Sequence, residues 1–331
     1  AAIGTAMVFA LTLILTGLAH GFRVEAERVV DSLGIDGYLI EDSAAGPFMG
    51  SSRFAEAEIR AVARIPGVET AIPVIYGNAI LRERDKPQNV NVYGVPERGP
   101  GMPSIAVGHA PSNAGEVAVS TTLGRSVGDD IAIGAGKLHI VGLVDKSTTL
   151  AGQANAFLTV AGAQRVMFSG QHVVSAIGVS GTAAQVPDGY RVVDRDATVD
   201  DMVRPLDGAH LAMSYMAILL WAVAALIVGS LIYLSALERT RDFAVFKAIG
   251  VGTGSVLAGL ALQAVLVTVV AAVLGGLLAM ALGPLFPMLV VVTISDFALL
   301  VVTAVAIGLL AGLAGLRHAV VVDPVLAFGG P

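Results

Sequence analysis

Four long apolar stretches, separated by charged segments, dominate the pattern of hydrophobic and polar positions along the chain. The first covers residues 1–20, and three more follow at 209–236, 255–283 and 296–316. A helix needs about 20 apolar residues to cross a bilayer. Each stretch is therefore predicted to be a transmembrane helix, and a short external loop, residues 284–295, is predicted between the last two. The fold class expected from this pattern is an α-helical membrane protein with four transmembrane helices.

A cleaved signal peptide is the alternative for the first stretch, and it would begin with basic residues and end at a small-residue cleavage site. The chain begins on Ala1 with no Met and no basic flank, so we expect that preceding residues have been trimmed. A spanning helix is favoured because three further apolar stretches follow. Apolar residues at roughly helical spacing continue through 22–33, which predicts an amphipathic stalk that ends at Gly34 and Gly37.

The segment between the first two apolar stretches, residues 21–208, has the pattern of a globular domain. A helix is predicted at 54–65, with Ser51 or Ser52 as its cap and Pro66–Gly67 as its end. A further helix is predicted to follow a strand within 157–167. β-branched runs predict the other strands, at residues 38–40, 68–81, 89–95, 115–120, 131–144 (two strands around a Gly-Ala-Gly turn) and 173–180. We therefore expect a large extracytoplasmic α+β domain inserted between helices 1 and 2.

Composition supports this division of the chain. Only 14% of the residues are charged, whereas a soluble protein carries about 25%. Residues 21–208 hold 22 acidic and 16 basic residues, and the rest of the chain holds 4 of each. An acidic domain is unsuited to nucleic acid, whose phosphates require Lys and Arg, and without cysteine the chain can form no disulfide.

Basic residues predict the topology. The four that lie outside the domain are Arg239, Arg241, Lys247 and Arg317, and they fall in segments 237–254 and 317–331. Short basic loops remain cytoplasmic, whereas large domains are translocated largely regardless of charge. We therefore expect segment 237–254 to be a cytoplasmic helix and loop, 317–331 to be a cytoplasmic tail, and the domain to be outside.

The sequence contains no catalytic, metal-binding or nucleotide-binding motif that we can identify. Its six histidines show no metal-ligand spacing, and the glycines at 250–254 do not match a phosphate-binding loop. We expect no enzyme activity and no cofactor on this chain. Within the spans, Gln263 is predicted to form an interhelical hydrogen bond rather than a substrate contact. Small residues four apart, at Ala271, Gly275 and Ala279, indicate either close helix packing or merely a Gly/Ala-rich composition.

Segment 237–254 is amphipathic although it is expected to face water. Phe243, Phe246 and Ile249 are apolar at helical spacing, Lys247 suits the last turn of a helix, and Gly250 suits its end. Physical chemistry leaves two interpretations open. The helix either lies in the membrane interface or docks its apolar side chains into the groove of a partner.

The amino-acid sequence of this segment resembles the signature of the FtsX-like permease family, the MacB-like (type VII) ABC transporter transmembrane subunits. That signature has the form E-R-x-x-E-[IF]-[GA]-x-[LF]-[KR]-A-[LI]-G, followed by a Gln in the next span. The matching positions are Glu238, Arg239, Phe243, Ala244, Phe246, Lys247, Ala248, Ile249, Gly250 and Gln263, and Asp242 stands where the family has Glu. The tail resembles the family ending at Arg317, Ala319, Asp323, Pro324, Ala327 and Phe328.

The resemblance implies a permease of the bacterial cell membrane that acts by mechanotransmission. A separate cytoplasmic ABC ATPase would carry ATP and Mg, and a second permease chain would complete a homodimer or heterodimer. An extracytoplasmic adaptor or hydrolase is a further implied partner. The residues implied to couple to the ATPase are Glu238, Arg239, Arg241, Asp242, Phe243, Phe246, Lys247 and Gly250.

The expected function is export or extraction of a hydrophobic or peptide substrate. Two alternatives stay open: an ATPase-driven regulator of a cell-wall hydrolase that transports nothing, and an anchored external binding protein without an ATPase.

Overall fold

The computed structural model describes residues 2–331 except 51, 83–86, 182–185, 239–244, 246–248, 250–251, 287 and 322–331. The chain divides into two compact units. The helical unit comprises Ala1–Gly21 and Gly208–Pro331, and the globular unit comprises Phe22–Asp207.

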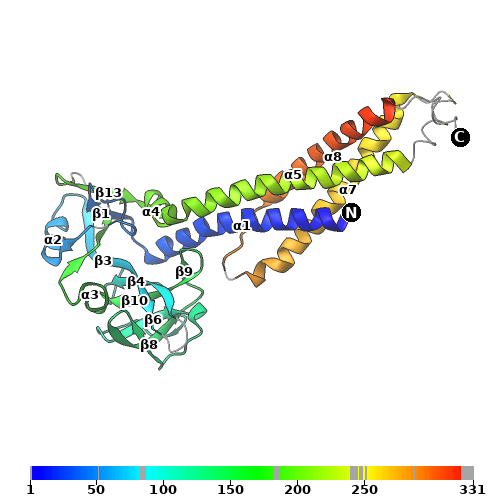
Figure 1. Cartoon of the computed structure of the whole chain (residues 1–331). Helices are drawn as coiled ribbons and strands as arrows, with labels where there is room; N and C mark the ends of the chain where they lie inside the picture. Colours follow the sequence, from blue (N-terminus) through cyan, green and yellow to red (C-terminus); the bar gives the residue numbers. More distant parts are fainter. Residues whose placement is uncertain are drawn as a thin grey trace. The chain divides into compact units, whose positions relative to one another are not determined.

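Long helices form the helical unit (Figure 1). They are α1 (Ala2–Leu33, whose first part lies here), α5 (Asp207–Glu238), α7 (Thr253–Leu282) and α8 (Ile294–Val321), and a short 3₁₀ turn, η3 (Gly283–Leu285), follows α7. Within the described residues, three helical stretches are long and apolar enough to cross a membrane, namely Ile3–Leu33, Arg195–Ser235 and Ala261–Leu285, and a shorter apolar helix covers Ile294–Ala306. The fourth span therefore stays a prediction.

Small residues allow the helices of this unit to approach closely. A Cβ atom added to Gly275 of α7 would lie 2.8 Å from the carbonyl oxygen of Ala6 and 2.8 Å from Cβ of Phe9, both in α1. Ala271 and Ala279, four residues away on either side, are buried. The spacing noted in the sequence thus marks a tight helix contact, as expected where lipid provides no hydrophobic drive for association.

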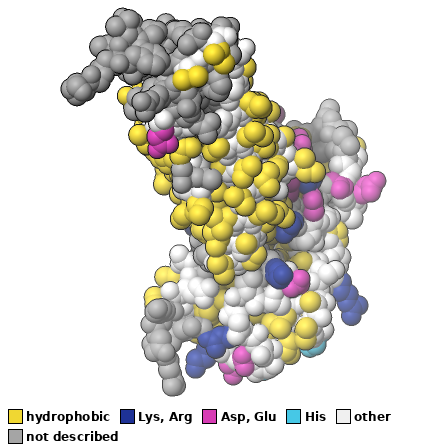
Figure 2. Space-filling view, turned by 90° about the vertical axis from the view of Figure 1, so that its right-hand side faces the viewer, with side chains coloured by type: hydrophobic (Ala, Val, Ile, Leu, Met, Phe, Trp, Pro, Cys, Tyr) yellow, Lys and Arg dark blue, Asp and Glu magenta, His cyan; other side chains and the backbone are white. Residues whose placement is uncertain are grey.

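The interhelical hydrogen bond predicted for Gln263 is confirmed, and an aromatic contact also joins two of the helices. Trp221 of α5 packs against Phe9, with the ring centroids 5.6 Å apart, so it lies between helices rather than at a membrane surface. Gln263 Nε2 of α7 donates a hydrogen bond to Ser235 Oγ of α5 over 3.1 Å. The outer surface of the unit carries many exposed apolar side chains, among them Leu219, Leu226, Leu262 and Met280, and Figure 2 shows a broad hydrophobic face.

A mixed sheet forms the centre of the globular unit. Its strands run in the order β13-β1-β12-β3-β4-β10-β6-β8-β5, with β7 beside β3 and β8, and β9 beside β10. The strands are β1 (Gly37–Glu41), β3 (Val68–Leu81), β4 (Gln88–Val95), β5 (Val107–Gly108), β6 (Glu116–Ser120), β7 (Asp130–Ile133), β8 (Gly136–Val144), β9 (Thr148–Thr149), β10 (Gln153–Thr159), β12 (Ala176–Gly181) and β13 (Tyr190–Asp194). Two short strands, β2 (Phe54–Ala55) and β11 (Val173–Val174), pair separately.

Side chains alternate between the two faces of the sheet along each strand, and a hydrophobic cluster covers each face. In β1, Tyr38 and Ile40 belong to one hydrophobic cluster and Leu39 to the other. The second cluster includes α2 (Glu56–Val62) and α3 (Val160–Phe168) through Val62 and Ala163. The first cluster contains the outer end of α1 and α4 (Arg195–Val203), so the sheet lies between two helical layers.

The structure corrects two expectations for this unit. The helix predicted at 54–65 is shorter, because Phe54 and Ala55 form β2 and Ala55 is the N-cap. Ser52 is not the cap: its hydroxyl accepts a hydrogen bond from the Glu41 amide, and the residue before it lies outside the described part. Glu58 instead accepts a hydrogen bond from the Ala55 amide over 2.9 Å.

The charged stretch before the second span has regular secondary structure. It forms β13, α4 and a 3₁₀ turn, η2 (Arg204–Leu206). One of its charged residues, Asp201, is fully buried in the globular unit.

Candidate functional site: the stalk and its junction with the globular unit

Residues 22–33, the outer part of α1, form the stalk that the sequence predicted. The buried face of this segment consists of Phe22, Ala26, Val29, Val30 and Leu33. These positions recur at three- and four-residue intervals, which places them on one side of a helix. The helix ends where Gly34 adopts φ 61°, a left-handed conformation that glycine reaches without strain.

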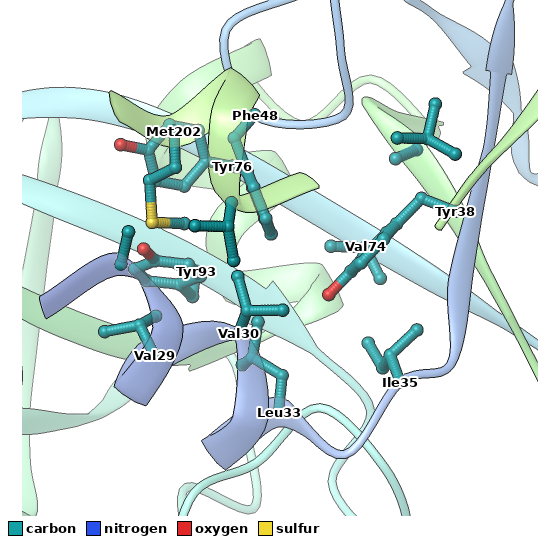
Figure 3. Packing of buried hydrophobic residues seen from close by; sticks show 14 of the residues in the cluster. Val29, Val30, Leu33, Ile35, Tyr38, Phe48, Val74, Tyr76, Tyr93 and Met202 are labelled. Atoms are coloured by element: carbon teal, nitrogen blue, oxygen red, sulfur yellow. The ribbon is translucent and has the colours of Figure 1, made fainter. Parts of the chain in front are cut away.

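The stalk is part of the core of the globular unit rather than a linker outside it. Val29, Val30 and Leu33 belong to the same hydrophobic cluster as Tyr38, Tyr76, Tyr93 and Met202 (Figure 3). At the centre of this cluster, the ring of Phe48 lies 5.3 Å from Tyr38 and 5.0 Å from Tyr76 in edge-to-face contact. Because protein interiors pack as densely as crystals, the stalk cannot shift without moving the side chains around it.

Hydrogen bonds attach the same face of the stalk to loops of the globular unit. Glu25 is 4% exposed, and its carboxylate accepts hydrogen bonds from the Thr148 hydroxyl and, over 3.3 Å, from the Gly152 amide. Burial raises the pKa of Glu25, and the hydrogen bonds only partly oppose that effect. At the end of the stalk, the Leu33 carbonyl accepts a hydrogen bond from the Gly101 amide over 2.6 Å.

The return segment, residues 195–206, is joined to the stalk by two ion pairs, which we call the clamp. Arg195 binds Asp31 through two contacts, Nε–Oδ1 at 2.6 Å and Nη2–Oδ2 at 2.8 Å. Nη1 of Arg23 lies 2.8 Å from Oδ1 of Asp200. The hydrogen bond from Arg195 lowers the pKa of the Asp31 carboxyl.

Local sequence explains the position of the return segment. The Asp194 side chain accepts a hydrogen bond from the Ala197 amide over 2.9 Å and so caps α4. Strand β13 immediately before it pairs antiparallel with β1, and Asp194 lies opposite Gly37. Asp201 anchors the other side of α4, since its Oδ2 accepts 2.9 Å hydrogen bonds from the amides of Phe48 and Met49.

The stalk and the return segment are therefore the two chain crossings between the globular unit and the long helices α1 and α5, and both are fixed in one core. Within the globular unit, a displacement of either segment has to be shared by the other and by the sheet. The arrangement is suited to transmitting movement, and it offers no reactive group.

The described residues include only part of the predicted coupling segment. Glu238 is the last residue of α5 and is exposed. Arg239, Arg241, Asp242, Phe243, Phe246, Lys247 and Gly250 lie outside the described residues. Between them, the Ile249 amide donates a 3.1 Å hydrogen bond to the Val245 carbonyl, which is the i to i−4 spacing of an α-helix. Ile249 is 70% exposed, which is expected of an apolar side chain that contacts lipid or a partner protein.

Sequence reasoning missed the clamp, Glu25 and a polar pair in the helical unit. His20 Nδ1 lies 3.0 Å from Oδ2 of Asp296, which also accepts a 2.8 Å hydrogen bond from the Thr293 amide. The Thr-x-x-Asp spacing at the start of α8 was a visible capping signal. The clamp joins residues 164 and 177 positions apart, so no local pattern indicated it. Within the described residues, no group of His, Cys, Asp and Glu side chains could hold a metal ion.

Comparison with known proteins identifies the family. The model of the MacB-like periplasmic core domain matches residues 1–202, and that of the FtsX-like permease C-terminal region matches residues 214–324. The chain belongs to the MacB-like and FtsX-like permease family. The resemblance seen in the sequence is thereby confirmed, and the globular unit is a domain of the MacB periplasmic type.

Two relatives in sequence agree with this assignment. A Mycobacterium tuberculosis protein named as an ABC transporter permease is 56% identical, over 100% of this chain and 95% of its own length. The macrolide export ATP-binding/permease protein MacB of Bordetella avium is 24% identical over 86% of this chain and 49% of its own. The solved periplasmic region of MacB from Actinobacillus actinomycetemcomitans is 10% identical, with a TM-score of 0.36, over 54% of this chain and 98% of that one. This chain is an ABC transporter permease of the MacB and FtsX type, a membrane component that acts with a cytoplasmic ATPase.

Proposed function

We propose that this permease works by mechanotransmission. The nucleotide cycle of a separate cytoplasmic ATPase drives closure of a dimer of two permease chains, and α1 and α5 carry the movement to the globular unit on the other side of the membrane. The chain crosses the membrane four times, with the globular unit between helices 1 and 2 and outside the cytoplasm. The substrate is a hydrophobic molecule or a peptide that is exported or extracted at the outer face.

The observation that carries this proposal is the construction of the stalk. Its apolar face belongs to the core of the globular unit, and Asp31 and Arg23 are paired with the return segment. A flexible linker would bend when the helices move, so the globular unit would not follow them. A stalk that is held by packing and ion pairs moves the globular unit with the helices. The Bordetella avium relative is named for macrolide export, which supports export of a hydrophobic molecule.

The coupling segment completes the proposal. We propose that it docks into a groove of the ATPase through Glu238, Arg239, Arg241, Asp242, Phe243, Phe246, Lys247 and Gly250. The exposed apolar side chain of Ile249 supports docking, because it is uncovered within the described part of the chain.

The test is co-purification of the full chain with an ABC ATPase from the same organism, followed by measurement of ATP hydrolysis in lipid nanodiscs. Phe246→Asp is expected to abolish binding of the ATPase, because a charge replaces an apolar docking side chain. Phe286→Asp is the matched control, since Phe286 lies in the loop after α7, at the end opposite the coupling segment. Normal binding of the ATPase by Phe246→Asp would contradict the proposed docking.

A second measurement separates the functions. Lipid or peptide recovered with the complex would support transport, and a captured cell-wall hydrolase would support regulation of that hydrolase. Unchanged function after charge reversal at Arg239 and Lys247 would indicate an anchored binding protein that uses no ATPase.

A further inference from the structure

An open cavity of about 710 Å³ lies in the globular unit, away from the stalk and the clamp. It is bordered by the end of β3, the β7–β8 hairpin and the segments before β6 and after η1 (Thr121–Leu123). Its volume falls in the range of small-molecule sites, which is about 300–1,000 Å³.

Positive charge surrounds this cavity although the chain as a whole is acidic. Arg82, Arg125 and Lys137 line it, and Asp130 is the one carboxylate among the lining residues that the structure describes. Asp130 is already engaged, because its Oδ1 lies 2.8 Å from Nδ1 of the lining residue His139. The chain carries a net charge of −6, so a cationic cavity is a local departure from its composition.

Strand register explains how the cations are arranged. Strand β7 lies between β3 and β8, with Leu81 opposite Ile133 and Ala132 opposite Lys137. The Arg82 amide donates a 2.8 Å hydrogen bond to the Ala132 carbonyl, so Arg82, Ala132 and Lys137 form one cross-strand row. Neighbouring strands are about 4.8 Å apart, which places the two cationic residues about 10 Å from each other on either side of a methyl group.

This row is shaped for an anion. The small side chain of Ala132 leaves a hollow between two long cationic side chains, and both of these are exposed. Neither Arg82 nor Lys137 has an ion-pair partner in the part of the chain that the structure describes. A guanidinium and an ammonium on either side of one hollow suit the several acceptor oxygens of a phosphate group.

We propose that this cavity binds a small molecule that carries a phosphate group, either a soluble phosphate ester or the headgroup of an anionic lipid. The cavity is concave and of ligand size, whereas protein partners occupy broad surfaces of about 800 Å² on each side. A small ligand therefore fits better than an acidic protein surface. The inference concerns the globular unit alone and does not depend on the coupling segment or on ATP hydrolysis.

The experiment is calorimetric titration of the purified full chain in dodecyl maltoside, a detergent without phosphate, at constant ionic strength. The probes are inorganic phosphate, glycerol 3-phosphate and dihexanoyl phosphatidylglycerol. Arg82→Gln and Lys137→Gln are each expected to weaken binding of the esters roughly tenfold, because each removes one charge-assisted contact. Ala132→Met is expected to weaken binding similarly without any change in charge, because it fills the hollow.

Arg60→Gln and Arg64→Gln are the matched controls, since both are exposed cations of the same unit outside the cavity, and binding should persist in each. Equal affinity for both esters would assign the soluble phosphate, and tighter binding of the lipid would assign the headgroup; either outcome supports the site. Three results would overturn it: no binding of any probe below about 10 mM, equal losses in the control variants, or binding of hexaglutamate peptide without binding of phosphate esters.

Discussion

Substitutions at Asp201 and Gly46 test how the return segment is anchored in the core. Asp201 is fully buried, and one of its carboxylate oxygens accepts hydrogen bonds from the amides of Phe48 and Met49. The other oxygen lies 3.2 Å from Nη1 of Arg204. A Cβ atom on Gly46 would lie 2.0 Å from the Asp201 Cγ, so the carboxylate occupies the space that a larger residue would need.

The magnitudes follow from these contacts. Asp201→Ala leaves one buried and one partly buried amide without an acceptor, and each such loss costs about 1–3 kcal/mol, so we expect about 4 kcal/mol in total. Asp201→Asn keeps an oxygen acceptor for both amides but loses the charge, and we expect about 1–2 kcal/mol. Gly46→Ala should cost about 3 kcal/mol, because the added methyl displaces the carboxylate from its donors.

The assay is pulse proteolysis of the full chain in a urea series, which gives the free energy of unfolding of the globular unit. Hydrogen exchange at the Phe48 and Met49 amides reports the lost bonds directly. The decisive measurement is the double variant Gly46→Ala/Asp201→Ala. Once the carboxylate is absent, the new methyl fills vacated space, so the double variant should be destabilised by less than the sum of the single variants.

Additive costs in this cycle would refute the reasoning, because they would mean that Gly46 and Asp201 act independently. A Gly46→Ala variant as stable as the unsubstituted chain would refute it as well, since it would show that the loop moves away without cost.

Three further predictions concern the helices and the stalk. Gly275→Leu should prevent close contact of α7 with α1 and lower the melting temperature in detergent, whereas Gly229→Leu, with no atom within 4 Å of its added Cβ, should not. Asp31→Arg should reduce transport-coupled ATP hydrolysis by breaking the clamp, and the double variant Asp31→Arg/Arg195→Asp should restore it; failure of the restoration would mean that the pair itself is not required. Because the pKa of Glu25 is raised in the folded unit, the folded unit retains a proton at pH values where the unfolded chain has released it. The free energy of unfolding should therefore fall as pH rises from the ordinary carboxyl pKa to the pKa of Glu25 in the folded unit. Glu25→Gln should flatten that part of the curve of unfolding free energy against pH, and an unchanged slope would exclude Glu25 as its source.

Local pattern was sufficient for much of the fold. Strands β3, β4, β6 and β8 were predicted because β-branched runs ended at turn residues, and the stalk was predicted because apolar residues continued at helical spacing beyond the first span. The helix at 54–65 was predicted too long for a physical reason. Phe54 fits the apolar face of a helix, but in the fold it pairs through β2 with β11, a contact that lies far away in sequence.

The coupling segment shows a different limit of sequence analysis. Its amphipathic pattern could not distinguish lipid from a protein groove, because both accept the same apolar side chains. The family signature favoured the ATPase, and the family models confirmed the membership but not the role of each residue. That role depends on a second protein, so it stays a prediction for Phe243, Phe246 and their neighbours until the complex is tested.

The clamp depends on one strand pairing that local sequence does not specify. Asp31 is close to the end of α1, three residues separate that helix from β1, and Arg195 begins α4 directly after β13. Because β1 and β13 pair with Gly37 opposite Asp194, the end of one helix and the start of the other have to meet, and their opposite charges then lie within reach. The charges on the stalk alone indicated only a solvated face. A two-residue change in this register would keep the buried face of the sheet but move the strand by almost 7 Å, which would separate Arg195 from Asp31. The hydrophobic core that fixes the register of β1 and β13 therefore also determines whether the stalk and the return segment move together.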